Sequence, residues 1–195
     1  MKTMQVHSNL QNHHAIKAKD GSGCPELVLQ TQRLFSVQYF NFEGVECEGQ
    51  IVVHESVEED IKKVFKLIHK IRFPIAKVIP IADEKYQFDD GLSCNDNNTS
   101  AFNYRTIAFT SKLSNHALGL AIDINPIQNP YIKFDELGKQ NFIAPSFGVY
   151  DEAVLGTLLP TSEVVVLFKK LGWEWGGDWL LTSGRLDYQH FEKIL

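Results

Sequence analysis

A carboxylate inside an apolar strand constrains this chain more than any other feature of its sequence. From Leu120 to Ile124 the large aliphatic side chains fall on one face of a two-residue period, and Asp123 falls on the other. This period indicates a half-buried β-strand. A buried carboxylate is costly unless a cation or hydrogen bonds satisfy it. His116, seven positions before Asp123, is the nearest residue that could share a metal ion with it.

A second imidazole and carboxylate follow near the other end of the sequence. His116, Asp123 and His190 form a set of two histidines and one carboxylate, which leaves a zinc coordination position open for water. Asp187 is then a spare carboxylate. On a straight strand residues i and i+3 face opposite ways, so we predict a backbone bend between Asp187 and His190. On spacing alone, a buried hydrogen-bonded cluster without metal remains the alternative.

Composition indicates one globular domain. A chain of 195 residues can bury one sizeable core, and 44% hydrophobic with 22% charged residues is ordinary for a soluble protein. We expect no membrane span, because no apolar run is long enough. The net charge is -5 and no cluster of Lys and Arg stands out, so we expect no nucleic-acid partner. We also expect a monomer.

Residues 1–24 are polar and contain a Gly-Ser-Gly run, which predicts a flexible N-terminal tail, with the folded domain over residues 25–195. This tail lacks the apolar core of a signal peptide. Either the protein is not exported by that route or the targeting segment is missing from this sequence. An odd number of cysteines permits at most one internal disulfide, and free thiols and a bridge from Cys24 or Cys47 both remain open.

Local patterns outline the secondary structure. Residues 34–42 and 49–54 are rich in β-branched and aromatic side chains and predict a β-hairpin. A helix follows, with Ser56 and Glu59 as a capping box and Pro74 closing the segment. Five apolar residues share its inner face, namely Ile61, Val64, Phe65, Ile68 and Ile71.

The second half of the chain is less regular. Residues 89–100 are rich in Asp, Asn, Ser and Gly, which predicts a loop throughout. Residues 132–160 show no pattern that predicts a helix or a strand. Thr161 or Ser162 begins a second helix, which ends at Gly172. Helices and hairpins without strict βαβ alternation predict an α+β fold, a single domain with a small antiparallel sheet flanked by helices.

All three tryptophans lie within residues 173–179, where two glycines and an aspartate interrupt the run. This pattern is compatible both with a loop that presents aromatic surface and with plain core packing. The sequence leaves the two interpretations open.

Two motifs resemble the signatures of the M15 zinc peptidases. Ser114-x-His116-x-x-Gly119-x-Ala121-x-Asp123 is similar to the first signature, and Asp187-x-x-His190-Phe191-Glu192 to the second. This family contains D-alanyl-D-alanine carboxypeptidases and dipeptidases and L-alanyl-D-glutamate endopeptidases. Residues 97–105, 125–131 and 175–179 are also similar to it, so that the resemblance covers residues 90 to 192.

The resemblance implies a Zn2+ ion held by His116, Asp123 and His190, with Asp187 as general base and acid. It also implies that Arg105 faces the substrate, where it would bind a carboxylate or stabilise the oxyanion. A salt bridge is the alternative for this arginine, and its candidate partners are Asp89, Asp90 and Asp96. Ser114 and Trp179 would lie near the bound peptide.

The implied function is zinc-dependent hydrolysis of the stem peptides of bacterial peptidoglycan, in the cell envelope or outside the cytoplasm. Carboxypeptidase members typically carry Glu at the base and Trp after the last histidine. Asp187 and Phe191 are closer to the endopeptidase and phage-lysin branch. Glu192 either orients His190 or is a surface charge. The alternative function is a non-catalytic zinc-binding or cell-wall-binding domain on the same fold.

Overall fold

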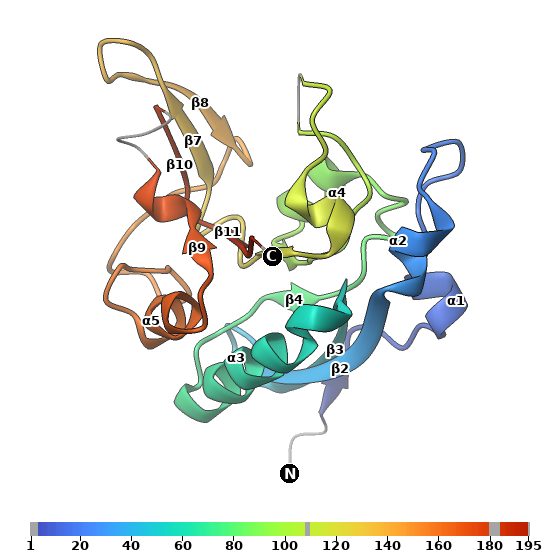
Figure 1. The fold of residues 1–195 in the computed structure, drawn as a ribbon. Helices are drawn as coiled ribbons and strands as arrows, with labels where there is room; N and C mark the ends of the chain where they lie inside the picture. The colour runs from blue at the N-terminus through green and yellow to red at the C-terminus, as the bar shows by residue number, and fades with distance from the viewer. Residues whose placement is uncertain (1–3, 108–109, 180–183, 195) are drawn as a thin grey trace.

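The structure is a computed structural model that describes residues 4–107, 110–179 and 184–194. It has a mixed α/β fold in which the described strands form several small sheets and the helices are few (Figure 1). The sequence predicted one small antiparallel sheet. The structure divides the strands among separate sheets instead, and two of these contain parallel pairs.

The predicted hairpin is confirmed and forms the base of the domain. Strand β2 (Gln32–Phe40) pairs antiparallel with β3 (Glu46–His54), and the inward side chains include Tyr39, Ile51 and Val53, all buried. Helix α3 (Glu58–Ile71) lies along this hairpin at the bottom of Figure 1. The expected apolar stripe of α3 completes the core on that side.

The ends of α3 differ from the prediction. Ser56 does not cap the helix, because a 3-10 turn, η1 (Glu55–Val57), precedes α3, and Nδ1 of His54 accepts a hydrogen bond from the Ser56 backbone N–H at 3.1 Å. The helix ends at Ile71, where Arg72 has a positive φ of 55°. Termination therefore comes from a left-handed residue before Pro74 is reached.

The N-terminal segment contacts the hairpin in the structure. Strand β1 (Gln5–Val6) pairs parallel with β3, and the Ser8 hydroxyl donates to Oε1 of Gln50 at 2.8 Å. Ala15 is buried at the end of helix α1 (Asn12–Ala15). Helix α2 (Glu26–Gln30) then leads into β2. The proposed division between a tail and a domain at residue 24 stays a prediction.

The prediction of loop structure throughout residues 89–100 is wrong. This segment contains helix α4 (Asp90–Asn95) and strand β5 (Asn98–Thr99), which pairs parallel with β4 (Lys77–Val78). The helix begins because Oδ1 of Asp89 accepts a hydrogen bond from the Leu92 backbone N–H at 2.9 Å. A side-chain oxygen at this position satisfies an N–H that has no partner within the helix.

A three-stranded sheet lies at the centre of the domain. Strand β6 (Ala121–Asp123) pairs antiparallel with β11 (His190–Glu192), which pairs with β9 (Glu174–Trp175). The predicted strand around Asp123 is confirmed, but it is buried on both faces and not on one. Phe191 in β11 stacks on Phe168 of helix α5 (Glu163–Lys170), with ring centroids 4.0 Å apart. As predicted, Ser162 caps α5 and Gly172 follows it with a φ of 83°.

Another sheet comes from a region that the sequence left unassigned. Strand β7 (Tyr131–Phe134) pairs with β8 (Gln140–Ala144) on one side and with β10 (Arg185–Asp187) on the other, both antiparallel. Figure 1 shows this sheet rising above β9 and α5, across from α4. Strand β10 connects it through a short turn to β11 in the central sheet.

The cysteines and the surface complete the description. Cys24, Cys47 and Cys94 are free thiols.

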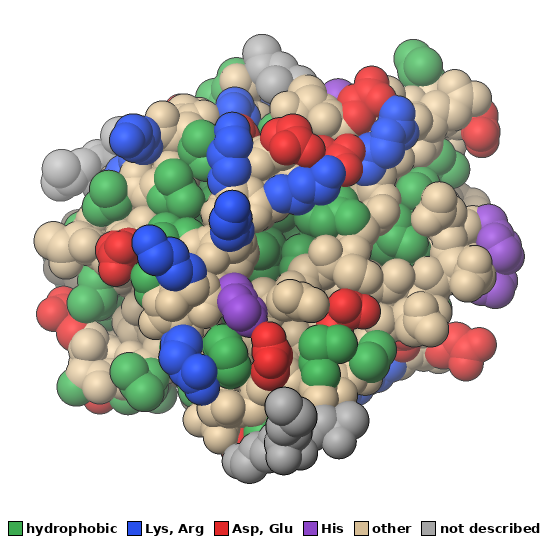
Figure 2. Space-filling view, turned by 90° about the horizontal axis from the view of Figure 1, so that it is seen from below, with side chains coloured by type: hydrophobic (Ala, Val, Ile, Leu, Met, Phe, Trp, Pro, Cys, Tyr) green, Lys and Arg blue, Asp and Glu red, His purple; other side chains and the backbone are tan. Residues whose placement is uncertain are grey.

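No helix of the described residues is long and apolar enough to cross a membrane. Figure 2 shows Lys and Arg side chains gathered across the lower face with Asp and Glu among them. On α3, for example, Lys62 pairs with Glu58 at 2.8 Å.

Candidate metal centre

The pairing of β6 with β11 brings the predicted metal-binding residues together. In this antiparallel register His190 lies opposite Asp123. His116 arrives from the 3-10 turn η2 (Asn115–Leu118), which immediately precedes β6. Gly119 ends this turn with a φ of 70°, and a Cβ there would collide with the Gln32 side chain. Glycine is therefore required at the point where the chain turns from His116 into the strand.

The three side chains are buried and converge. Their potential ligand atoms lie within 4.8 Å of one another. Nε2 of His116 is 3.2 Å from Nδ1 of His190 and 3.2 Å from Oδ2 of Asp123. Nδ1 of His190 is 3.0 Å from Oδ1 of Asp123. The structure thus confirms the predicted juxtaposition of these residues, which could hold a metal ion.

The second nitrogen of each ring has its own acceptor. Nδ1 of His116 is 2.6 Å from the carbonyl oxygen of Ala101, and Nε2 of His190 is 3.0 Å from Oε2 of Glu192. Asn115 donates from Nδ2 to the same Glu192 oxygen at 2.8 Å. When these outer nitrogens carry the protons, the inner nitrogen of each ring can direct a lone pair toward a metal ion held between the two rings and Asp123. This second layer of hydrogen bonds is usual around metal-binding histidines.

The donor set and its spacing fit a divalent metal ion. Imidazole nitrogens and a carboxylate are zinc ligands, and two atoms bound to one tetrahedral ion at about 2.0–2.1 Å lie about 3.3 Å apart. The separations of 3.0 to 3.2 Å among His116, Asp123 and His190 are close to that value. A cation would also satisfy the buried carboxylate of Asp123.

The charges within the cluster shift its pKa values. Burial raises the pKa of Asp123, but the charges and hydrogen bonds of His116 and His190 outweigh burial and hold it below the ordinary value. Burial lowers the pKa of His190, but hydrogen bonds to Asp123 and Glu192 raise it to about 10. The raised pKa favours the doubly protonated form of His190, and a metal ion that binds its Nδ1 would have to displace the proton there.

Asp187 lies beside this cluster on a different strand. The predicted bend is confirmed, because Asp187 ends β10 and His190 begins β11 after the turn at residues 188–189. Oδ1 of Asp187 is buried and has no hydrogen-bond partner among the described residues. Burial raises the pKa of Asp187 to about 6, with the Asp123 charge adding to the rise. Gly176 lets the chain approach, since a Cβ there would meet the backbone of Asp187.

Arg105 forms one of the salt bridges considered from the sequence. Its Nη2 is 2.9 Å from Oδ2 of Asp90, at the start of α4. Asp96 pairs instead with Lys77, at 2.8 Å. Nε of Arg105 is buried and has no hydrogen-bond partner among the described residues. The role of Arg105 toward a substrate stays a prediction.

Ser114 and the tryptophans have clear structural positions. The buried Ser114 side chain caps η2, because its Oγ accepts a hydrogen bond from the His116 backbone N–H at 3.3 Å. Trp173 and Trp175 are core residues. Trp179 is half-buried, with its ring centroid 5.3 Å from that of His190. Both interpretations of the tryptophan run therefore apply, to different residues. Contacts of Ser114 and Trp179 with a peptide remain predictions.

Sequence reasoning missed one part of the site and left another undecided. Glu192 is not merely a surface charge, since it bonds to His190. Its partner Asn115 was not expected, because a contact between residues 77 positions apart leaves no local pattern. Cys94 also lies near the site, with Sγ 4.0 Å from Oε1 of Gln189. Burial, followed by the charges of neighbouring carboxylates, raises the pKa of Cys94, which keeps it a thiol.

Comparison with known proteins agrees with this geometry. Residues 108–193 match a model of the M15 peptidase family that is described as D-alanyl-D-alanine carboxypeptidase. This segment contains both signature motifs, so the resemblance to M15 peptidases is confirmed there. No curated protein and no solved structure matches the chain.

Proposed function

We propose that this protein is a zinc-dependent peptidase that hydrolyses peptide bonds in the stem peptides of bacterial peptidoglycan. One observation carries the proposal. His116, Asp123 and His190 form a three-residue group that could hold a metal ion, inside the segment that matches M15 peptidases. A structural zinc site is normally closed by a fourth protein ligand, whereas a catalytic site keeps one position open. The buried carboxylate of Asp187 lies beside this group and has the properties of a base.

A bound metal ion and Asp187 would each contribute to the hydrolysis. A zinc ion bound here would polarise the scissile carbonyl and lower the pKa of water toward about 7. With a pKa of about 6, Asp187 is mostly ionised at neutral pH, so it would accept a proton from the attacking water. It would then deliver that proton to the leaving amine.

Arg105 and Glu192 would support this reaction. Arg105 would bind a substrate carboxylate or the developing oxyanion, with Asp90 fixing its guanidinium. Glu192 would hold the His190 ring so that Nδ1 faces the cluster. Asp187, and Phe191 after the last histidine, favour the endopeptidase type over the carboxypeptidase type. Either bond, L-Ala-D-Glu or D-Ala-D-Ala, is compatible with these residues.

Mass spectrometry of defined muropeptides tests the proposal. Zinc-loaded protein should cleave a stem peptide, the fragment masses should identify the bond, and EDTA should abolish cleavage. The Asp187→Ala variant should retain zinc and lose turnover. Asp20→Ala is a matched control, since that carboxylate is exposed and far from the site in sequence.

Two results would count against the proposal. Full activity of Asp187→Ala would contradict the assigned base. Zinc and muropeptide binding without cleavage would favour the non-catalytic domain instead. The proposal includes a monomeric state and a location in the cell envelope or outside the cytoplasm, which size-exclusion chromatography and fractionation would test.

A further inference from the structure

Strand β10 places a cation on the same side of its sheet as Asp187. Alternate residues of a strand point to opposite faces, so Arg185 and Asp187 share one face and Leu186 points to the other. Burial follows this alternation, because Leu186 is buried and the residues on either side of it are half-buried. The face of Arg185 and Asp187 is turned toward the candidate metal centre, because Arg185 lies over the Trp179 ring and Trp179 lies against His190.

The neighbouring strand β7 extends this face. In the antiparallel register Lys133 lies opposite Arg185, and Tyr131 lies opposite Asp187. Directly opposed residues point to the same side of a sheet, and the intervening Ile132 is buried on the other side. Two cations and an aromatic ring thus share a surface with the proposed base.

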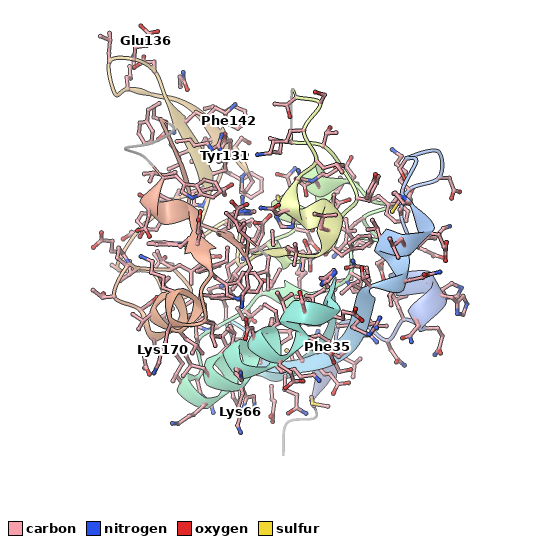
Figure 3. The ribbon with its side chains drawn as sticks, viewed as in Figure 1. Phe35, Lys66, Tyr131, Glu136, Phe142 and Lys170 are labelled. Carbon is pink, nitrogen blue, oxygen red and sulfur yellow. The ribbon has the colours of Figure 1, made fainter. Side chains whose placement is uncertain are left out.

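Strand β8 adds a second aromatic ring. Phe142 pairs with Lys133 and is 45% exposed, and its ring centroid is 5.9 Å from that of Tyr131. Nζ of Lys133 is 5.6 Å from the Tyr131 ring centroid and 5.5 Å from that of Phe142. Figure 3 shows Tyr131 and Phe142 together at the base of the hairpin, far from Glu136 at its tip.

Trp179 connects this face to the candidate metal centre. The guanidinium carbon of Arg185 is 5.2 Å from the Trp179 ring centroid, and that ring is 5.3 Å from the ring of His190. Stacking on Trp179 and a hydrogen bond to Tyr131 hold the guanidinium in place. A guanidinium has five N–H donors, so it can bind Tyr131 and an anion at the same time. Asp187 does not neutralise this cation through Oδ1, which has no hydrogen bond among the described residues.

We propose that Arg185, Lys133, Tyr131, Phe142 and Trp179, here called the basic face, form a subsite for a carboxylate of the substrate. This inference rests on the proposed function and specifies which part of a stem peptide the protein recognises. Arg185 would bind the carboxylate, and the aromatic rings would cover the neighbouring backbone and side chain.

The spacing indicates where this carboxylate lies in the substrate. Arg185 and Asp187 are two residues apart on one strand, which corresponds to about 6.6 Å. An extended peptide covers that distance in about two residues. The recognised carboxylate therefore belongs to a residue adjacent to the bond that is cut. The α-carboxylate of a glutamyl residue in a stem peptide satisfies this requirement.

Binding of two matched peptides tests the subsite separately from catalysis. The peptides are identical stem peptides in which the glutamyl residue carries either a free α-carboxylate or a carboxamide. Isothermal titration calorimetry would measure their dissociation constants for zinc-loaded Asp187→Asn protein, which should not consume them. We expect the dissociation constant of the carboxylate peptide to be lower than that of the carboxamide peptide by about tenfold or more, because a hydrogen bond to a charged group is stronger than one to a neutral group.

Variants in the same background assign the preference to the basic face. Adding Arg185→Gln should reduce the preference at least several-fold, Arg185→Lys should retain part of it, and Lys133→Gln should reduce it to a smaller extent. Lys139→Gln, an exposed lysine just before β8, should leave it unchanged. Circular dichroism would verify that each variant is folded.

The outcomes separate the two proposals. Equal affinity for the two peptides, binding of neither, or an unchanged preference in Arg185→Gln overturns the subsite even if wild-type protein cleaves muropeptides. A preference that depends on Arg185 supports the subsite, and absence of cleavage by the wild type would then overturn the peptidase proposal alone.

Discussion

Replacing Asp187 with asparagine should stabilise the metal-free protein at neutral pH. The Asp187 pKa is about 6 in the folded state, against an ordinary value of 3.8, because its carboxylate is buried. A difference of about two pKa units corresponds to about 3 kcal/mol between the two protonation states. Oδ1 has no hydrogen bond among the described residues to offset this cost.

The sign of the pH dependence follows from the direction of the shift. Because the folded pKa is raised, the favourable contribution of Asp187 is fully present below pH 3.8 and is lost as the pH rises through about 6. An asparagine has no charge to bury, although its amide also needs hydrogen bonds. We therefore expect a net gain of about 1 to 3 kcal/mol at pH 8, and little or none at pH 4.

Urea unfolding of EDTA-treated protein measures this effect. The free energies of unfolding of wild type and Asp187→Asn would be compared at both pH values, so that the contributions of groups common to the two proteins cancel. Asp20→Asn is the matched control, since its carboxylate is exposed and should change stability little at either pH. The same difference between wild type and Asp187→Asn at pH 4 and pH 8 would refute the reasoning.

Three further substitutions test the supports of the site. Glu192→Ala should weaken zinc binding by about 10- to 100-fold and Glu192→Gln by less, as measured by competition with a chromogenic chelator, because His190 loses its outer partner. Gly119→Ala should lower the free energy of unfolding by more than about 1 kcal/mol in urea, since its φ of 70° and the nearby Gln32 side chain both disfavour a Cβ. Phe168→Ala should cost about 3–5 kcal/mol in the same assay, because it removes a buried ring stacked on Phe191; a loss below 1 kcal/mol would contradict that packing.

The three residues that could hold a metal ion were predictable because each belongs to a short motif with a defined spacing. Asp123 lies on a strand with a clear period of two, and the bend before His190 follows from the opposite faces of residues i and i+3. The surroundings were not predictable in the same way. The contact between Asn115 and Glu192, and the register that places Lys133 beside Arg185, join segments distant in sequence. Local patterns carry no information about such pairings.

Some local signals were also missed for identifiable reasons. The Asp89 cap of α4 lies in a run of Asp, Asn, Ser and Gly, residues that favour both helix starts and turns. The β7–β8 hairpin has short strands and an irregular register between Lys133 and Phe134, which weakens the alternation of its side chains. Its pairing with β10 stabilises it, and that strand comes much later in the chain.

The pairing of β6 with β11 also determines when the protein could bind a metal ion at His116, Asp123 and His190. Asp123 and His190 are 67 positions apart, so a chain emerging from the ribosome exposes two of the three metal-binding residues long before the third. Closing such a loop costs conformational entropy that the central sheet must offset. High-affinity zinc loading should therefore coincide with the docking of β11. A metal ion would then be held tightly only after β6 and β11 have paired.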